Sequence, residues 1–204
     1  MDILICRLIE QASLKNALPK HILEKLSHEG LNIFGSCLIA NLPAEIQHDL
    51  TKAGIPLENF TSMSMLAHGG RTLWTRIPQP AIKEQHPIDK HTLRLLEEFG
   101  EKLILFPVEK WTIPLQRLGR FINLARPSLL GLDHNPEFGL WFAYRAVFLT
   151  KSALPETLLK DWDSPCNTCV DKPCMTASSP RLARIACPYK SDHQYTEEQM
   201  NYHY

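Results

Sequence analysis

The spacing of apolar residues along the chain alternates between two patterns, and each pattern predicts a different kind of element. Apolar positions three or four residues apart predict an amphipathic helix, whereas a short run of β-branched and aromatic residues predicts a strand. Helices are predicted over residues 2–13, 19–28, 43–53, 73–76, 89–99 and 114–123. Strands are predicted over residues 31–40, 60–66, 103–106 and 140–150. Residues 78–87 hold three prolines and are predicted to form a loop.

The predicted helices and strands interleave, which favours a layered α/β or α+β fold for residues 1–155. The composition then changes, because residues 156–204 hold four cysteines, four prolines and few apolar residues that could form a core. A segment of this kind is best ordered by a bound metal or by docking on a larger domain. The sequence therefore predicts two parts, an α/β domain followed by a small cysteine-rich, metal-binding tail.

The charge balance and the hydropathy exclude several classes of function. The 22 basic residues equal the 22 acidic ones and form no cluster, so we expect no nucleic-acid partner. No apolar run approaches the ~18 residues that a membrane span needs. The first residues, MDILICRLIEQASLK, have no basic residue before the apolar stretch and no small-residue cleavage site, so no secretory signal is predicted. We expect a cytoplasmic protein, in which thiols stay reduced.

Four cysteines lie close together in the tail and are candidate metal ligands. Cys166, Cys169, Cys174 and Cys187 follow the spacing Cys-x2-Cys-x4-Cys-x12-Cys, and Pro188 comes directly after the last one. Bacterial ferredoxins complete a 4Fe–4S site of three closely spaced cysteines with a distant cysteine that precedes a proline. The arrangement therefore predicts one 4Fe–4S cluster.

A zinc site and a lost metal site stay open as alternatives for these cysteines. A structural zinc ion also accepts four cysteine ligands, although a second Cys-x2-Cys pair is usual in such sites. A remnant of a metal site would leave the four thiols free. Ser178 stands where a second cluster would need a cysteine, and its hard, protonated hydroxyl is expected outside the coordination shell. His193 and His203 lie near enough in the sequence to replace a missing ligand.

The remaining two cysteines and most tryptophans are predicted to be structural. Cys6 and Cys37 sit alone in apolar segments and are expected to be small buried hydrophobic residues. Trp74, Trp111 and Trp141 are expected in the core or at contacts between the two parts of the chain.

A family resemblance extends over residues 65–204. The segment LGLDHNPEFGLWFAYRAVFL, residues 130–149, resembles the His-Pro-x-x-Gly-x-Trp-x-x-x-Arg segment of CblC-type cobalamin-processing proteins, with an extra Asn135 after the histidine. It is also similar to the cobalamin-binding part of epoxyqueuosine reductases, which carry two iron–sulfur clusters. The chain most resembles a group of bacterial ferredoxin-like proteins, through the segments GRTLW, HPID, FP and ARIACP and through its cysteines.

The resemblance implies a nitroreductase-like α/β domain, a pocket for cobalamin or another large cofactor, and one remaining cluster. It makes Arg145 a candidate for that pocket, although an arginine in a strand can instead form a structural salt bridge. His134 is a further candidate, with a loop histidine that bonds to the backbone as the alternative. Arg71, in the segment His68-Gly-Gly-Arg71, is the third candidate, with an ordinary turn as the alternative to a phosphate-binding nest.

These observations predict a cytoplasmic iron–sulfur redox protein, an oxidoreductase if it is an enzyme. Its single cluster is expected to exchange electrons with the N-terminal pocket and with a donor or acceptor protein. The alternative is a non-catalytic protein for cobalamin trafficking or protein interaction, with a structural zinc ion or no metal. Serine-hydrolase, P-loop, Rossmann and HExxH signatures are absent from the sequence.

Overall fold

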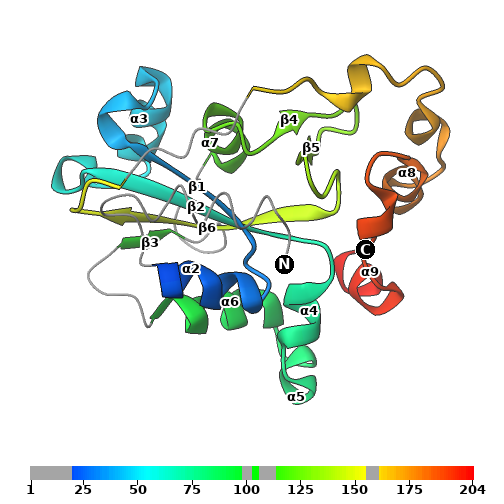
Figure 1. The fold of residues 1–204 in the computed structure, drawn as a ribbon, viewed down its shortest axis with the longest axis horizontal. Helices are drawn as coiled ribbons and strands as arrows, with labels where there is room; N and C mark the ends of the chain where they lie inside the picture. Colours follow the sequence, from blue (N-terminus) through cyan, green and yellow to red (C-terminus); the bar gives the residue numbers. More distant parts are fainter. Residues whose placement is uncertain (1–19, 98–102, 106–113, 155–160) are drawn as a thin grey trace.

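The computed structural model describes residues 20–97, 103–105, 114–154 and 161–204, so the predicted helix over residues 2–13 lies outside the described residues. Within these ranges a four-stranded sheet carries helices on both faces (Figure 1). The strand order is β1-β2-β6-β3, and all neighbouring strands are antiparallel. The strands are Ile33–Leu38 (β1), Ser62–Gly69 (β2), Leu103–Leu105 (β3) and Phe142–Thr150 (β6).

Each face of the sheet packs against its own helices, α3 and α7 on one side and α2 and α6 on the other (Figure 1). Strand β2 is buried along its whole length, and its side chains alternate between two apolar cores. Met65 belongs to the core beneath α3 and α7, whereas Leu66 belongs to the core beneath α2 and α6. The helices of this part are Lys20–His28 (α2), Ala44–Lys52 (α3), Thr72–Arg76 (α4), Gln79–Ile82 (α5), Pro87–Glu97 (α6) and Leu115–Phe121 (α7), with single turns at Ile39–Asn41 (η1) and Leu57–Asn59 (η2).

A β-bulge interrupts the pairing of β2 with β6. Leu66 pairs with Ala146, and the next residue of β2, Ala67, pairs with Tyr144, so Arg145 is an extra residue on β6. Tyr144 packs against the core beneath α3 and α7. Arg145 points to the side of α6, where its Nη1 lies 3.6 Å from an oxygen of Asp89. The bulge therefore directs the arginine into the interior, towards a partner charge.

The tail lies at one end of the sheet, beside a short antiparallel pair of strands (Figure 1). Trp141, directly before β6, forms an apolar cluster with Tyr195 and Met200 of the tail. The elements here are Arg126–Pro127 (β4), Asp133–His134 (β5), Pro165–Asn167 (η3), Pro173–Thr176 (η4), Pro180–Ala186 (α8), Ser191–His193 (η5) and Glu197–His203 (α9). Apolar packing therefore holds the tail beside β6, in addition to any ordering of the tail by a bound metal.

The structure confirms the mixed α/β fold, with a helix or strand in each predicted segment that it describes. The predicted loop over residues 78–87 is wrong at Gln79–Ile82, where α5 forms one turn because Pro80 is tolerated at the start of a helix. The elements β4, β5, α8 and α9 are not among the predicted ones, since such short elements depend on tertiary contacts. The nitroreductase-like assignment and the division into residues 1–155 and 156–204 stay predictions.

No helix in the described part of the chain is both long enough and apolar enough to cross a membrane.

Candidate metal centre

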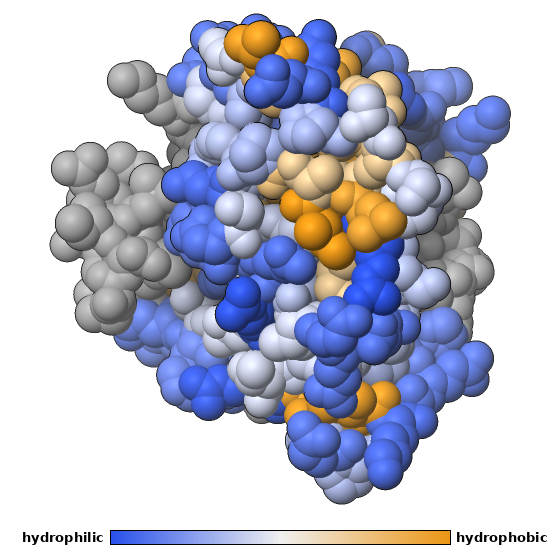
Figure 2. All heavy atoms as spheres, turned by 90° about the vertical axis from the view of Figure 1, so that its right-hand side faces the viewer, coloured by the Kyte–Doolittle hydropathy of each residue, from blue (hydrophilic) through white to orange (hydrophobic). Residues whose placement is uncertain are grey.

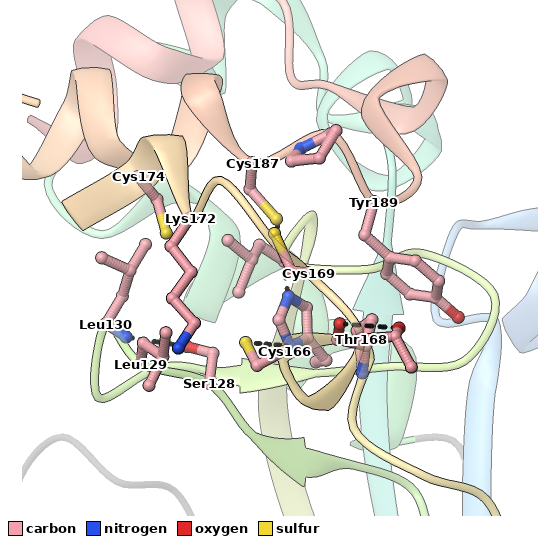
Figure 3. A pocket seen from close by; sticks show the side chains of 14 residues that line it. Ser128, Leu129, Leu130, Cys166, Thr168, Cys169, Lys172, Cys174, Cys187 and Tyr189 are labelled. Atoms are coloured by element: carbon pink, nitrogen blue, oxygen red, sulfur yellow. Dashed lines mark hydrogen bonds between the residues drawn. The ribbon is translucent and has the colours of Figure 1, made fainter. Parts of the chain in front are cut away.

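The four candidate cysteine ligands line one cavity of about 270 Å³. Figure 3 shows Cys166, Cys169, Cys174 and Cys187 around a common space. His134 lines the same cavity, and the rest of its wall is mostly apolar and includes Leu129, Leu130, Leu140 and Tyr189. The structure therefore brings together the residues that the cysteine spacing predicted as one ligand set.

Short turns and one helix end position three of these cysteines. Cys166 lies in η3, where the Ser164 side chain accepts a hydrogen bond from the Cys166 backbone N–H at 3.4 Å. Cys174 lies in η4, which begins after Lys172, a residue in the left-handed conformation with a φ of 43°. Cys187 follows α8 directly and is its C-cap. Local backbone geometry thus sets the direction of these three thiols.

His134 contacts two of the thiols, a relationship that the cysteine spacing does not indicate. Its Nδ1 lies 3.9 Å from the Sγ of Cys166, and its Nε2 lies 3.6 Å from the Sγ of Cys187. The side chain comes from β5 and is 1% exposed. Burial lowers the pKa of His134 from 6.5 to about 4, so the imidazole is neutral at neutral pH and has one N–H to donate.

The electrostatics of the cavity favour a bound positive group. Burial raises the pKa of the Cys187 thiol, and although a backbone hydrogen bond at Tyr189 opposes this, Cys174, Cys166 and Cys169 raise it further. Four thiolates in one apolar cavity repel one another, so ionising them all requires a cation among them. Lys172 lines the same cavity and contributes one positive charge, and a bound metal centre would contribute the rest.

The chemistry of the four thiols suits the predicted cluster, and a single zinc ion stays the alternative. A zinc ion holds its four sulfur ligands at about 2.3 Å from one point. In the described part of the chain, no three side chains of the Cys, His, Asp or Glu type converge on such a point. The four thiols surround a cavity, and 4Fe–4S clusters take four cysteine thiolates. The residues present therefore fit the predicted cluster.

The two remaining predicted cofactor residues lie away from this cavity. Arg145, whose side chain is 12% exposed, donates from Nε to His68 Nδ1 at 2.8 Å and faces Asp89 on α6. Arg71 donates from Nε to the main-chain oxygen of Gln194. Neither arginine lines the cysteine cavity, so the structure does not gather Arg145, His134 and Arg71 around it, and their cofactor roles stay predictions.

A second cavity, of about 440 Å³, lies beside the first, and Leu140 lines both. Its polar wall residues include Arg184, Tyr195 and His203. Arg184 is not among the candidates predicted from the sequence, although it lies within the segment ARIACP. An arginine flanked by apolar residues in a short segment is a signal of burial that could have identified it.

The predicted substitute ligands are placed elsewhere. His193 packs edge-on against Phe138, with ring centroids 4.8 Å apart, and His203 lines the second cavity. Ser178 is exposed and does not line the cysteine cavity. None of these three residues lines the cysteine cavity, so the candidate ligands remain the four cysteines.

The residues predicted to be structural are buried where the structure describes them. Cys37 and Trp141 are fully buried, and Trp74 is nearly so. Cys6 and Trp111 lie outside the described residues.

No protein-family model matches the chain, and no curated protein matches it. Similar solved structures are epoxyqueuosine reductases. The one from Streptococcus thermophilus is 11% identical, with a TM-score of 0.49 over 83% of this chain and 65% of that one. The one from Bacillus subtilis is 11% identical, with a TM-score of 0.46 over 83% and 52% of the two chains. An epoxyqueuosine reductase bound to an epoxyqueuosine-modified tRNA-Tyr stem loop is 13% identical, with a TM-score of 0.47 over 83% and 52%.

The chain thus spans between 52% and 65% of the length of these enzymes. The sequence resemblance to epoxyqueuosine reductases has a counterpart among solved structures, while the resemblance to CblC-type and ferredoxin-like proteins stays a prediction.

Proposed function

We propose that the chain binds one 4Fe–4S cluster through Cys166, Cys169, Cys174 and Cys187 and acts as an iron–sulfur redox protein. The observation that carries the proposal is that these four cysteines, from separate short elements of the tail, line one cavity. When bound, such a cluster supplies one-electron chemistry, and the protein supplies ligands, burial and hydrogen bonds to sulfur.

The residues around the cavity have defined tasks in this proposal. His134 offers its single N–H to the Sγ of Cys166 or of Cys187, and such a bond stabilises the more negative, reduced state. The apolar wall, including Leu130 and Leu140, keeps water away from one side of the ligands. The hydrogen bond and the apolar wall have opposite effects on the reduction potential. A hydrogen bond to sulfur raises the potential, whereas burial of negative charge lowers it.

An electron donor or acceptor protein is part of the proposal, and an apolar surface of the tail supports it. Val170 and Met175, each one residue after a candidate ligand, are 90% and 56% exposed. Leu182, on α8, is 47% exposed. Figure 2 shows patches of apolar side chains on this face of the molecule. Exposed apolar patches of this kind are typical of protein interaction sites.

Anaerobic purification tests the function. The proposal predicts a brown protein with about four iron atoms per chain. The alternative, a non-catalytic protein with a structural metal, predicts a colourless protein with about one zinc ion per chain. A protein that holds zinc or no metal after anaerobic reconstitution with iron and sulfide contradicts the electron-transfer function.

A corrinoid or another large cofactor is the finer part of the proposal, and it rests on the sequence resemblance. Cobalamin added to the anaerobic protein is expected to change its absorbance spectrum on binding. Arg145→Ala is expected to weaken that response, whereas Arg117→Ala, at an arginine that is 50% exposed on α7, is expected to retain it. An unchanged spectrum with the wild-type protein removes the corrinoid. The cytoplasmic location and the lack of a nucleic-acid partner rest on composition alone.

A further inference from the structure

Arg184 is a buried cation without a carboxylate partner in the described part of the chain. It is 8% exposed. Its Nε and Nη2 donate to the main-chain oxygen of Leu140 at 3.0 and 2.5 Å. The guanidinium carbon lies 4.9 Å from the ring centroid of Trp141 and 4.5 Å from that of Tyr195. Carbonyl dipoles and aromatic faces thus hold the guanidinium in place, but they leave its full charge uncompensated.

This arginine lines the second cavity. The volume of about 440 Å³ lies within the range of small-molecule sites, which is roughly 300–1,000 Å³. Apolar side chains, among them Leu115, Leu132 and Phe142, form much of the remaining wall. The described wall also holds Asp133, which is paired with Arg120, so Arg184 is the unpaired charge in a largely apolar pocket, a composition that orients a small ligand by its charged end.

A second polar group in the same wall lacks a partner. The Nε2 of His203 is buried and has no hydrogen-bond partner among the described residues, although His203 lines the cavity. Gln199, one turn earlier on α9, is fully buried, and both of its side-chain amide atoms lack partners as well. Buried polar atoms without partners are rare in native proteins, so these atoms mark hydrogen bonds that the described residues leave unmade beside the cavity, although Gln199 itself does not line it.

The charges around the cavity favour an anion. The one acidic residue in the described wall, Asp133, is already bound, because Arg120 Nη2 donates to it at 2.6 Å and the Tyr144 hydroxyl at 2.7 Å. The positive charge of Arg184 has no such counterpart. Burial, followed by the positive charges of Arg145 and Arg184, lowers the pKa of His203 to about 4, which indicates a positive potential at this imidazole.

We propose that the second cavity binds a small organic oxyanion, a carboxylate or a phosphate monoester. Its anionic oxygens pair with Arg184, and its apolar part lies against Leu115 and Phe142. The binding claim does not depend on the cluster. A further consequence rests on the proposed function. Leu140 lines both cavities, so the ligand and the proposed cluster would both lie beside this residue.

Isothermal titration of the anaerobically purified full chain tests the binding. The probes are benzoate and phenyl phosphate, with benzamide as a neutral molecule of similar shape. At least one anion is expected to bind with one site per chain and at least tenfold more tightly than benzamide. The stronger of the two probes identifies the oxyanion as carboxylate or phosphate. No binding of either anion at millimolar concentration, or equal binding of benzamide, overturns the proposal.

Variants locate the site. Arg184→Met is expected to weaken anion binding at least tenfold, whereas Arg181→Met, on the same helix but paired with Glu197 and Asn201 outside the cavity, is expected to retain it. Since Arg184 also holds main-chain carbonyls, its loss can disturb folding, so Leu115→Trp serves as a second variant that fills the cavity and keeps the arginine. Full affinity in Leu115→Trp overturns the proposed location. Zinc or no metal at the cysteines removes the redox function but leaves these binding results unchanged.

Discussion

The Nε2 of His134 lies 3.6 Å from the Sγ of Cys187, although 53 residues separate the two in the sequence. The contact joins β5, at the edge of the α/β part, to the end of α8 in the tail. The cysteine cavity is therefore a shared structure of both parts of the chain, and its properties depend on a residue outside the cysteine motif.

The first prediction concerns the reduction potential of the proposed cluster. Loss of the His134 hydrogen bond in His134→Leu is expected to lower the midpoint potential, because the bond stabilises the reduced, more negative state. A bond of about 1.4 kcal/mol corresponds to about 59 mV for one electron. Voltammetry of the anaerobic protein measures the shift. His193→Leu, at a histidine that packs on Phe138 outside the cavity, is the matched control and is expected to leave the potential unchanged. Equal potentials in His134→Leu and the wild type would falsify the role of this bond.

The second prediction separates ligands from bystanders in the tail. Cys169→Ser is expected to lose most of the bound iron, since a serine hydroxyl is a hard ligand that stays protonated near neutral pH. Ser178→Ala, at an exposed serine outside the cavity, is expected to keep the wild-type iron content. Iron and sulfide analysis after anaerobic purification measures both variants. Full iron content in Cys169→Ser, or iron loss in Ser178→Ala, contradicts the ligand assignment.

The third prediction concerns the packing of α7 on β6. A Cβ atom at Gly119 would lie 2.6 Å from the Cζ of Tyr144, so the tyrosine has to move. An exchange of glycine for alanine within a helix usually stabilises it by about 1 kcal/mol. Here Gly119→Ala is expected to lower the free energy of unfolding by roughly 1–3 kcal/mol, because it displaces Tyr144 from its bond to Asp133.

Urea unfolding measures this change. Tyr144→Phe, which removes the hydroxyl and keeps the ring, is expected to cost about 1 kcal/mol through the lost hydrogen bond. A Gly119→Ala variant as stable as the wild type would show that α7 does not approach β6 as closely as the structure indicates.

The fourth prediction is a loss of stability in mild acid. The pKa of His203 is about 4 in the folded chain, mainly through burial, and 6.5 is its ordinary value. The unfolded chain therefore binds the proton first as the pH falls. The free energy of unfolding is expected to decrease between about pH 6.5 and pH 4, with roughly 2 kcal/mol lost from this residue between pH 7 and pH 5.

His203→Gln, which stays neutral over this range, isolates the contribution of His203. The charged groups nearest to the imidazole, Arg145 and Arg184, keep their charge, and the neighbouring Tyr195 and Tyr202 rings stay neutral. His134 is present in both proteins, and the charge of His203 also lowers the pKa of His68, so the difference between the two pH profiles reports residue 203 together with its effect on His68. Identical profiles for the variant and the wild type rule out a buried, neutral His203.

The strands of the main sheet and its covering helices, without α5, β4 and β5, and the set of four cysteines follow from the amino-acid sequence alone, because both depend on local information. The alternation of apolar residues in β2 and the helical spacing in α6 set the faces that are buried. The spacing of the cysteines, with Pro188 after the last, indicates one ligand set without knowledge of the fold.

The surroundings of those ligands depend on the tertiary structure. The sequence makes His134 a candidate for a cofactor pocket, but the β4–β5 pair places it between Cys166 and Cys187. Arg145 meets His68 and Asp89 because a single extra residue in β6 turns it inwards, and no spacing pattern marks that bulge. Arg184 reaches the second cavity because α8 packs on the start of β6. These contacts join residues far apart in the sequence, and their energies depend on burial and on partners that only the folded chain provides.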